Sequence, residues 1–404
     1  MYKVFWCKVN KYYLNKWLAY FEQSNQDISK DLIIATCVVT DRAKNKWLRE
    51  VKLALDRGQK VYITWCGVFD QGKKMCDEQF YTIYPELSEC KNMIELLWEE
   101  PGRTDTREVA THEFKTINLY TKKFVMIQNG CDTHCTFCLT ILKRWKNRSR
   151  DLEDIVMEIN EFVAGGGREI VLTGINLAAW WSESTRKPEQ SNFSDLLEAI
   201  IKHTSIPRIR ISSLWPEFLD EKFFQLMKNP RFLPHFHFSI QSFSDKVLKL
   251  MNRNYDAALL DRVLTRIRNL ERPDQSLISI GADIITGFPG ETAEEFEKTV
   301  EGVRKYGITK LHTFPFSAHE KWESVPAAKL PEQIPFSQRK QRNSKLLAVW
   351  DEVRNKFIAK NKGTKHSVLI EQIKWWKYHG WTENYIQVEL DGEYKKGDVV
   401  EVVL

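Results

Sequence analysis

Short apolar runs alternate with stretches of helical periodicity through the middle of this chain, and this alternation constrains its fold more than any other feature. The predicted strands are Phe124–Gln128, Ile170–Thr173, Arg208–Ser213, Phe236–Ile240, Leu277–Ile285 and Lys310–Phe314. The predicted helices between them are Leu152–Ala164, Asn192–His203, Glu221–Met227, Ala257–Asn269 and Ala293–Tyr306. Because βα connections are right-handed, such strands lie parallel in one sheet. The pattern predicts an α/β fold with a partial, TIM-like (β/α)6 barrel, whose functional residues lie at the carboxyl ends of the strands.

Three cysteines with the spacing C-x3-C-x2-C follow the first of these strands: Cys131, Cys135 and Cys138. Three thiolates so close in sequence can bind three irons of a 4Fe-4S cluster. The fourth iron then has no protein ligand and is open to a small chelating molecule, for which we expect S-adenosylmethionine. The sequence therefore predicts an iron-sulfur site at the rim of the barrel.

Two other interpretations of these cysteines, a zinc site and disulfide bonds, are less well supported by the sequence. A structural zinc site needs a fourth cysteine or histidine at ligand spacing, and His134 is too close to Cys135 in sequence to complete a tetrahedron comfortably. A disulfide bond among the three cysteines would leave the third thiol unpaired, and nothing in the sequence marks the chain as secreted. An iron-sulfur cluster fits the local pattern best.

A second group of cysteines lies in the first hundred residues. Three short apolar runs there are predicted strands: Val4–Trp6, Leu32–Ala35 and Val61–Thr64. One cysteine lies within two residues of the end of each strand, at Cys7, Cys37 and Cys66. Parallel strands place their carboxyl ends along one edge of a sheet, so the three thiols are expected to converge. The alternative is three separate apolar cysteines buried in a core.

The size and composition suit an enzyme of several domains. With 404 residues, 43% of them hydrophobic, the chain can bury sizeable cores, and two or three domains are expected. No apolar run approaches the roughly 20 residues that span a bilayer, and the first residues resemble a strand more than a signal peptide. We therefore expect a cytoplasmic protein without a membrane partner, whose cysteines serve metal or redox chemistry.

Residues 123–176 resemble the core of the radical S-adenosylmethionine methylthiotransferases, which attach a methylthio group to tRNA or to a ribosomal protein. The resemblance extends over nearly the whole chain. Phe5–Asn10 is similar to the amino-terminal signature of the family, and its second and third signature cysteines match Cys37 and Cys66. Further similar blocks are His235–Ser242, Leu248–Arg253, Asp283–Thr292 and Gly380–Tyr385. The last of these resembles the TRAM domain, a small β-barrel that binds RNA.

The resemblance implies two 4Fe-4S clusters with different tasks. The cluster on Cys131, Cys135 and Cys138, here called the radical triad, would bind S-adenosylmethionine and cleave it to a 5′-deoxyadenosyl radical. This radical removes hydrogen from an unreactive carbon. The cluster on Cys7, Cys37 and Cys66, here called the auxiliary triad, would carry the sulfur, which a second S-adenosylmethionine methylates before transfer.

The resemblance also implies contacts to S-adenosylmethionine and a division into domains. The expected contacts are Thr173, Gly174, Gly287, Gly290 and Glu291, and the alternative is that the glycines only form turns. The expected parts are residues 1–106 (a methylthiotransferase domain with the auxiliary cluster), 118–336 (the partial barrel), 337–362 (a helical connector) and 363–404 (a TRAM-like RNA-binding domain). The segment Gly102–Thr106 would end the first part.

Two basic stretches and an aromatic tail indicate RNA as the substrate class. The first stretch comprises Lys143, Arg144, Lys146, Arg148 and Arg150, and the second comprises Arg339, Lys340, Arg342 and Lys345. Basic side chains beside the rim of an active site suit a phosphate backbone, although a charge run is often only a solvated face. The tail carries Tyr378, Trp381 and Tyr385, and aromatic rings stack on the splayed bases of single-stranded loops.

Within the family, the blocks Leu172–Asn176, Ile211–Leu214 and Pro234–His237 most resemble the enzymes that act on N6-threonylcarbamoyladenosine at position 37 of tRNA, beside the anticodon. The implied partners are the tRNA anticodon stem-loop, an electron donor such as flavodoxin or ferredoxin, and a sulfur donor. Enzymes for N6-isopentenyladenosine come second and the ribosomal-protein enzyme third. Outside the family, the alternative is an iron-sulfur RNA-binding or sulfur-relay protein without radical chemistry.

Tryptophan stands at five positions where the family usually has glycine: Trp6, Trp65, Trp145, Trp181 and Trp322. Glycine permits positive φ and close backbone approach, whereas an indole side chain forbids most such conformations. Our hypothesis is that the source organism reads UGA as glycine and that this sequence was translated with UGA as tryptophan. UGG codons at Trp6, Trp65 and Trp322 would refute it.

Overall fold

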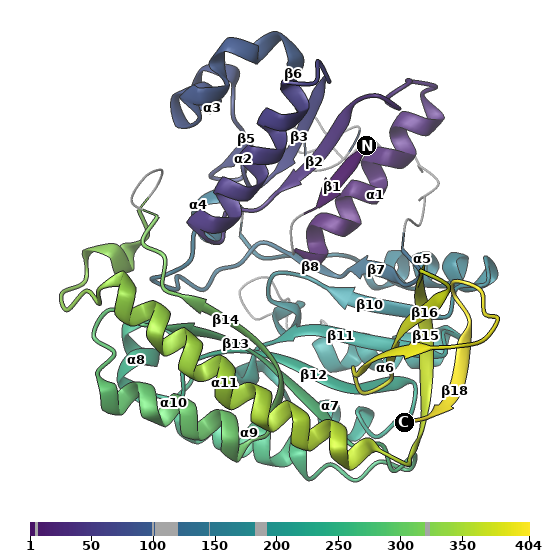
Figure 1. The fold of residues 1–404 in the computed structure, drawn as a ribbon. Coiled ribbons are helices and arrows are strands. Elements are labelled where there is room, and N and C mark those ends of the chain that lie inside the picture. The colour runs from purple at the N-terminus through teal and green to yellow at the C-terminus, as the bar shows by residue number, and fades with distance from the viewer. Residues whose placement is uncertain (5–6, 99–100, 102–119, 145, 182–191, 320–323) are drawn as a thin grey trace.

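The computed structural model describes residues 1–4, 7–98, 101, 120–144, 146–181, 192–319 and 324–404. Trp6, Trp145, Trp322 and the predicted domain boundary at Gly102–Thr106 lie outside the described residues. The chain forms two parallel sheets with their helices and a carboxy-terminal antiparallel sheet (Figure 1). Within the described ranges, every helix is too short or too polar to cross a membrane.

The amino-terminal sheet has four parallel strands in the order β1-β2-β3-β6. Its strands are β1 (Tyr2–Val4), β2 (Leu32–Thr36), β3 (Val61–Trp65) and β6 (Ile94–Leu96). The other elements of this part are α1 (Lys8–Gln23), α2 (Asp41–Leu55), β4 (Phe69–Asp70), β5 (Lys73–Lys74), α3 (Asp77–Ile83) and the 3-10 helix η1 (Pro85–Met93). The parallel pairing predicted for the first three strands is confirmed. The pattern missed β6 because three residues are too few to show a period.

The central sheet has six strands in the order β14-β13-β12-β11-β10-β7, and every neighbouring pair is parallel. Its strands are β7 (Lys123–Met126), β10 (Glu169–Thr173), β11 (Arg208–Leu214), β12 (Phe232–Gln241), β13 (Ser279–Thr286) and β14 (Ile308–Pro315). Its helices are α5 (Leu152–Ala164), α6 (Phe193–His203), α7 (Glu221–Leu226), α8 (Asp245–Leu250), α9 (Ala257–Arg268) and α10 (Ala293–Lys305). Six parallel strands in one open sheet, with β7 and β14 at its edges, confirm the predicted alternation.

Short elements connect these strands and helices at the edge where the radical triad lies. They are β8 (Gln128–Asn129), α4 (Thr140–Lys143), β9 (Arg148–Ser149), η2 (Leu177–Ala179), η3 (Pro216–Phe218) and η4 (Pro326–Lys329). The strands β8 and β9 pair with each other and bracket the cysteine loop.

The two faces of the central sheet differ in chemistry. On β12, Phe236, Phe238 and Ile240 belong to the large apolar core that helices α5 to α10 cover. The alternate residues of the same strand, among them His235 and His237, lie on the opposite face, here called the inner face. The amino-terminal sheet lies on that side of the central sheet (Figure 1). The inner face is therefore where a polar site can form.

The carboxy-terminal part joins the central sheet through one long helix. This helix is α11 (Phe336–Asn361), which lies along β14 (Figure 1). An antiparallel sheet of order β17-β16-β15-β18 follows. Its strands are β15 (Lys365–Lys374), β16 (Lys377–Thr382), β17 (Gln387–Leu390) and β18 (Val399–Val403).

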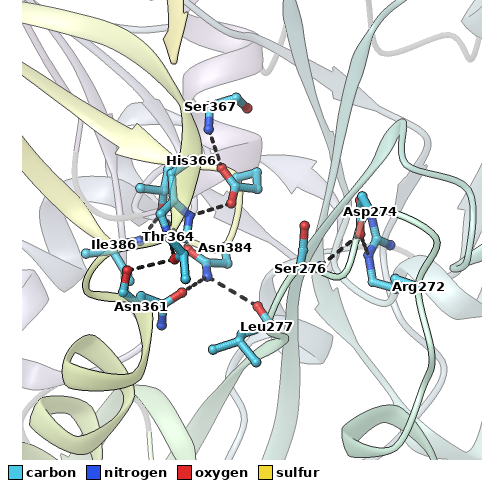
Figure 2. Close-up of polar contacts among 12 residues, drawn as sticks. Arg272, Asp274, Ser276, Leu277, Asn361, Thr364, His366, Ser367, Asn384 and Ile386 are labelled. Atoms are coloured by element: carbon cyan, nitrogen blue, oxygen red, sulfur yellow. Dashed lines mark hydrogen bonds and ion pairs between the residues drawn. The ribbon is translucent and has the colours of Figure 1, made fainter. Parts of the chain in front are cut away.

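A buried amide fixes this sheet against its neighbours. Asn384 Nδ2 donates to Asn361 Oδ1 at the end of α11 (2.7 Å) and to the Leu277 carbonyl ahead of β13 (3.3 Å). Beside it, the His366 ring contacts the carboxylate of Glu383 (2.6 Å) (Figure 2). Breaking these hydrogen bonds would leave buried polar groups unpaired, which is costly in free energy. The bonds therefore fix the position of the carboxy-terminal sheet relative to α11 and the start of β13.

The hairpin between β15 and β16 is strained. Lys374 pairs with Lys377, so Trp375 and Trp376 form a two-residue loop, with φ of 52° and 63°. Such loops favour glycine or asparagine, since a bulky side chain at positive φ is disfavoured. Both indoles are almost fully exposed, at 92% and 94%. The two indoles therefore make too few packing contacts to offset the backbone strain.

We expect the double substitution Trp375→Gly and Trp376→Gly to raise the free energy of unfolding by about 1–2 kcal/mol, because it removes left-handed strain at two residues at some cost in chain entropy. Thermal unfolding followed by circular dichroism measures the change. The control is Trp375→Ala with Trp376→Ala, which removes both indoles but keeps side chains at positive φ. Equal stabilisation by the alanine pair would contradict strain as the cause.

Candidate functional site

The radical triad lies on the loop between β8 and α4, at the carboxyl edge of the central sheet. Cys131 and Cys135 are buried in a small cluster with Trp215, and Cys138 packs against it. The backbone N–H of Thr133 donates to Cys131 Sγ (3.4 Å), and that of Thr140 donates to Cys138 Sγ (3.3 Å). Backbone donors aimed at sulfur stabilise thiolates, as a bound cluster requires.

Burial controls the protonation of these thiols. It raises the pKa of Cys131, and it raises that of Cys135 to about 12, although Arg253 opposes the shift. The neighbouring Cys138 raises both values further. Iron binding must therefore displace protons here, and Arg253 favours the charged form of Cys135.

Two charged residues beside the radical triad are not apparent from the cysteine spacing. Arg253 Nη1 donates to Cys135 Sγ (3.3 Å), and its guanidinium lies 3.7 Å from the centroid of the Trp215 ring. Glu217, on η3, has both carboxylate oxygens buried without a hydrogen-bond partner among the described residues, and burial raises its pKa. The block Leu248–Arg253 contains the arginine. For Glu217 the sequence gives no signal except its place after β11.

The three cysteines of the auxiliary triad lie beside helix α1 and the ends of strands β2 and β3. Cys7 precedes α1, Cys37 follows β2, and Cys66 follows β3. Burial raises the pKa of Cys37 to about 12, and the thiols of Cys66 and Cys7 add to this shift. Each thiol thus lies within electrostatic range of the other two.

Arg144 links the two triads. It follows α4, directly after the loop of the radical triad, and its Nη2 donates to Cys66 Sγ (2.9 Å). Its guanidinium lies 4.4 Å from the centroid of the Trp65 ring. A buried cation beside three thiols stabilises their charged forms.

The burial of Arg144 corrects one inference from the sequence. Lys143 and Arg144 belong to the first predicted basic stretch, but their side chains are buried and not available to a phosphate backbone. Lys143 Nζ lies 3.6 Å from Asp70, and Arg150 forms an ion pair with Glu158 (2.6 Å). Spacing along the sequence could not show this, because the partners come from distant segments.

The spacing of the sulfur atoms tests which metal group the triads fit. Sulfur ligands of one tetrahedral zinc ion lie about 3.8 Å apart. In the described part of the chain, no three cysteine sulfurs lie within 4.8 Å of one another. A 4Fe-4S cluster takes each thiolate on a different iron and needs a wider triangle. The spacing in this part of the chain therefore does not suit a single tetrahedral ion in either triad.

One apolar core holds Cys66 of the auxiliary triad together with residues of the central sheet. The core that holds Cys66 contains Val9 and Tyr13 of α1, Phe124 of β7 and Val171 of β10, with Cys7 packed against it. The amino-terminal and central sheets therefore share a core between the two cysteine sites.

Comparisons with known proteins identify the family. The pattern of the radical SAM superfamily matches residues 125–303, which include the radical triad. The threonylcarbamoyladenosine tRNA methylthiotransferase MtaB of Rickettsia prowazekii is 30% identical over 92% of this chain and 87% of its own length. This chain belongs to the radical S-adenosylmethionine methylthiotransferases. It is thus an enzyme that uses a 4Fe-4S cluster and S-adenosylmethionine.

Two further relatives in sequence also have the names of tRNA-modifying enzymes. The MtaB protein of Thermotoga maritima is 30% identical over 97% of this methylthiotransferase and 90% of its own length. The tRNA-2-methylthio-N(6)-dimethylallyladenosine synthase of Bacillus subtilis is 29% identical over 88% of this chain and 71% of its own length. Among solved structures, the radical S-adenosylmethionine methyltransferase TsrM of Kitasatospora setae is 16% identical, with a TM-score of 0.47 over 74% of this chain and 66% of that one.

Two of the predicted S-adenosylmethionine contacts of the methylthiotransferase lie beside the radical triad. Thr173 ends β10, and Gly174 packs so tightly on Gln128 that a Cβ there would come within 2.8 Å of its carbonyl oxygen. Gln128 Oε1 accepts from the backbone N–H groups of Ile175 and Asn176. Gly174 thus brings β10 against the start of the cysteine loop.

The other predicted contacts form a turn against α11. Gly287 has φ of 69°, and its N–H donates to Glu291 Oε2 (2.7 Å). The same oxygen accepts from Arg342 of α11 (2.7 Å). A Cβ at Gly287 would come within 2.5 Å of the Arg339 side chain. These residues hold the connector helix, and as S-adenosylmethionine contacts they stay a prediction.

Two of the tryptophans at glycine positions have glycine-like conformations. Trp65, directly before Cys66, has φ of 79°, and Trp181 has φ of 50°. The indole N–H of Trp65 is buried without a partner among the described residues. An indole at positive φ whose buried N–H lacks a partner among the described residues is costly in free energy, which supports the UGA hypothesis.

Proposed function

We propose that this enzyme converts N6-threonylcarbamoyladenosine at position 37 of tRNA into its 2-methylthio derivative. The observation that supports this most directly is the presence of two separate cysteine triads, with Arg144 following the loop of one triad and donating to Cys66 of the other. One triad suits radical generation and the other suits sulfur delivery. The names of the MtaB relatives, which match this chain over most of its length, supply the nucleoside.

The residues that would hold the cofactors follow from the site. Cys131, Cys135 and Cys138 would bind the radical cluster, and Cys7, Cys37 and Cys66 a second 4Fe-4S cluster. When bound, the two clusters supply the electron that cleaves S-adenosylmethionine and the sulfur that is transferred.

The protein's own charged residues orient this chemistry. Arg253 stabilises the thiolate of Cys135, and Arg144 stabilises that of Cys66. The unpaired carboxylate of Glu217 suits the ammonium group of S-adenosylmethionine beside the radical triad. Thr173 and Gly174 place the β10 edge next to the cysteine loop.

The architecture supports the same proposal at the level of domains. The six parallel strands suit the partial (β/α)6 barrel of 118–336, and the antiparallel sheet suits the TRAM-like domain of 363–404. Residues 1–106 would carry the auxiliary cluster, with 337–362 as connector.

The aromatic residues Trp381 and Tyr385 of the tail lie at its junction with the barrel. Their ring centroids are 4.5 Å apart, and the Tyr385 ring stacks on His235 with a centroid distance of 4.3 Å. These rings therefore serve the junction instead of an open RNA surface. An electron donor such as flavodoxin or ferredoxin and a sulfur donor complete the system.

Mass spectrometry of tRNA nucleosides tests the proposal. A bacterial host that makes N6-threonylcarbamoyladenosine but lacks its methylthiotransferase is transformed with this gene, with codons recoded for the host. We expect the 2-methylthio derivative of that nucleoside to appear. A variant with Cys135→Ala is the control. Methylthiolation of N6-isopentenyladenosine alone would assign the second substrate instead, and modification of neither would contradict a tRNA substrate.

A further inference from the structure

Three neighbouring strands of the central sheet each place one metal-ligating side chain on the inner face. The residues are His237 of β12, Asp283 of β13 and His312 of β14 (Figure 1). Asp283 and His312 are paired across their strands, and His237 pairs with Gly281, two residues before Asp283. Side chains alternate along a strand, so paired residues and residues two positions apart share a face. The register of the sheet therefore brings the three side chains together.

The potential ligand atoms of these side chains lie at coordination spacing. Asp283 Oδ1 is 2.9 Å from His237 Nε2 and 3.3 Å from His312 Nδ1. One nitrogen of each ring and one carboxylate oxygen all lie within 4.8 Å of one another. Ligands that bind one ion at about 2.1 Å lie roughly 2.9 to 3.4 Å apart, for octahedral and tetrahedral angles respectively. Both distances between a ring and the carboxylate fall in this range.

Gly281 determines how the His237 ring is oriented. A Cβ at this glycine would come within 2.4 Å of His237 Nδ1. Because Nδ1 lies against the glycine, the other ring nitrogen, Nε2, is the one that faces Asp283. Any larger residue at position 281 would displace the ring from the carboxylate. The backbone of β13 thus makes room for one imidazole nitrogen to face the other two ligands.

The charge state of the group suits a cation. Burial lowers the pKa of His237, so the ring is neutral at pH 7 and has a lone pair for a metal. Burial would raise the pKa of Asp283, but the two histidines outweigh it and lower the pKa, so the carboxylate is charged. The arginines of β11, Arg208 and Arg210, form ion pairs with Glu169 instead. The group therefore combines two imidazoles with one carboxylate that has no arginine partner among its printed ion pairs.

The three side chains differ in their access to solvent. The side chain of His237 is 5% exposed and that of Asp283 is 23% exposed, whereas that of His312 is 45% exposed. An ion held by them would thus be enclosed on the side of β12 and accessible on the side of β14. Three protein ligands leave a coordination position of such an ion open to water or to another oxygen ligand.

We propose that His237, Asp283 and His312 bind one divalent transition-metal ion, with ligands that belong to neither cysteine triad. Two imidazoles and one carboxylate form the ligand set of many zinc and non-haem iron(II) sites. The alternative is a hydrogen-bonded group without an ion, in which both rings donate to the carboxylate. The site does not depend on which nucleoside the enzyme modifies.

Calorimetric titration with zinc tests the inference. Zinc is the probe because nitrogen and oxygen ligands bind it more tightly than iron(II). The enzyme is used with both iron-sulfur clusters reconstituted, so that the cysteines are occupied by iron. We expect about one zinc ion to bind per chain of the wild type. His312→Ala and Asp283→Asn should each weaken zinc binding by about 100-fold or more, since loss of even a supporting contact costs about 10–100-fold. The iron content should be the same in all three proteins.

X-ray absorption at the zinc edge identifies the ligands directly. The expected first shell consists of nitrogen and oxygen at about 2.0–2.2 Å. A shell that contains sulfur at about 2.3 Å would place the zinc on cysteines and overturn the inference.

A second histidine beside a carboxylate provides the matched control. His379 Nδ1 lies 3.8 Å from Glu389 in the carboxy-terminal sheet, outside the three-ligand group. His379→Ala should therefore bind zinc as the wild type does. Zinc should also raise the Tm of the wild type and of His379→Ala but not that of His312→Ala, because a ligand that binds the native state stabilises it. Circular dichroism without zinc shows that each variant is folded. Failure of the wild type to bind zinc, or equal zinc affinity in the wild type, His312→Ala and Asp283→Asn, would show a hydrogen-bonded group only.

Discussion

Substitution of Cys37 by alanine is expected to abolish methylthiolation while 5′-deoxyadenosine formation continues, whereas Cys135→Ala abolishes both. The two cysteines lie in different triads: Arg253 donates to Cys135 of the radical triad, and Arg144 donates to Cys66 of the auxiliary triad. Loss of a thiolate ligand should reduce the dependent activity by more than the roughly 10–100-fold that loss of a supporting contact costs.

The measurement uses reconstituted protein, a chemical reductant, S-adenosylmethionine and a modified stem-loop, with both products quantified by mass spectrometry. Iron content should fall by about half in each variant, because each is expected to lose one of two four-iron clusters. Cys90→Ala removes a cysteine that belongs to neither triad and should keep both products. Full methylthiolation by Cys37→Ala would contradict the role of the auxiliary triad.

The features that the sequence predicted are those set by local periodicity. The six central strands show apolar residues directed at one core, and the cysteine spacing follows from a single loop, so both are visible in a window of a few residues. The auxiliary triad needed one further rule, namely that parallel strands end on the same edge. It converges for that reason, although Cys7 and Cys66 are far apart in sequence.

The features that the sequence did not reveal depend on which distant segments meet. From the sequence, Arg144 is expected to be a solvated residue of a basic stretch, yet folding buries it against Cys66 and Trp65. Tyr385 is expected to stack on RNA bases, yet it stacks on His235. The sequence alone does not show which residue a charged or aromatic side chain will contact in the folded protein.

Glu169→Gln is expected to destabilise the protein by about 3–5 kcal/mol, the usual cost of removing one partner from a buried ion pair. Glu169 is 1% exposed and forms ion pairs with both Arg208 and Arg210. Arg208 also contacts Ser367, and Arg210 donates to the carbonyl of Glu383 (3.2 Å). The loss should therefore loosen the carboxy-terminal sheet, seen as faster proteolysis near Gly363.

The same carboxylate predicts how stability depends on pH. Burial alone would raise the pKa of Glu169, but Arg210 and Arg208 outweigh it and lower the pKa to about 2. Since the unfolded value is near 4.3, the carboxylate stabilises the fold above that pH, and this contribution of about 3 kcal/mol is lost as the pH falls toward 2. The free energies of unfolding of wild type and Glu169→Gln, measured with urea, should converge below about pH 4.

Glu389→Gln is the control, because Glu389 forms an exposed ion pair with Lys377. Its free energy of unfolding should stay within about 1 kcal/mol of the wild-type value at every pH. A gap between wild type and Glu169→Gln that does not narrow with acid would show that the arginines do not depend on the charge of Glu169.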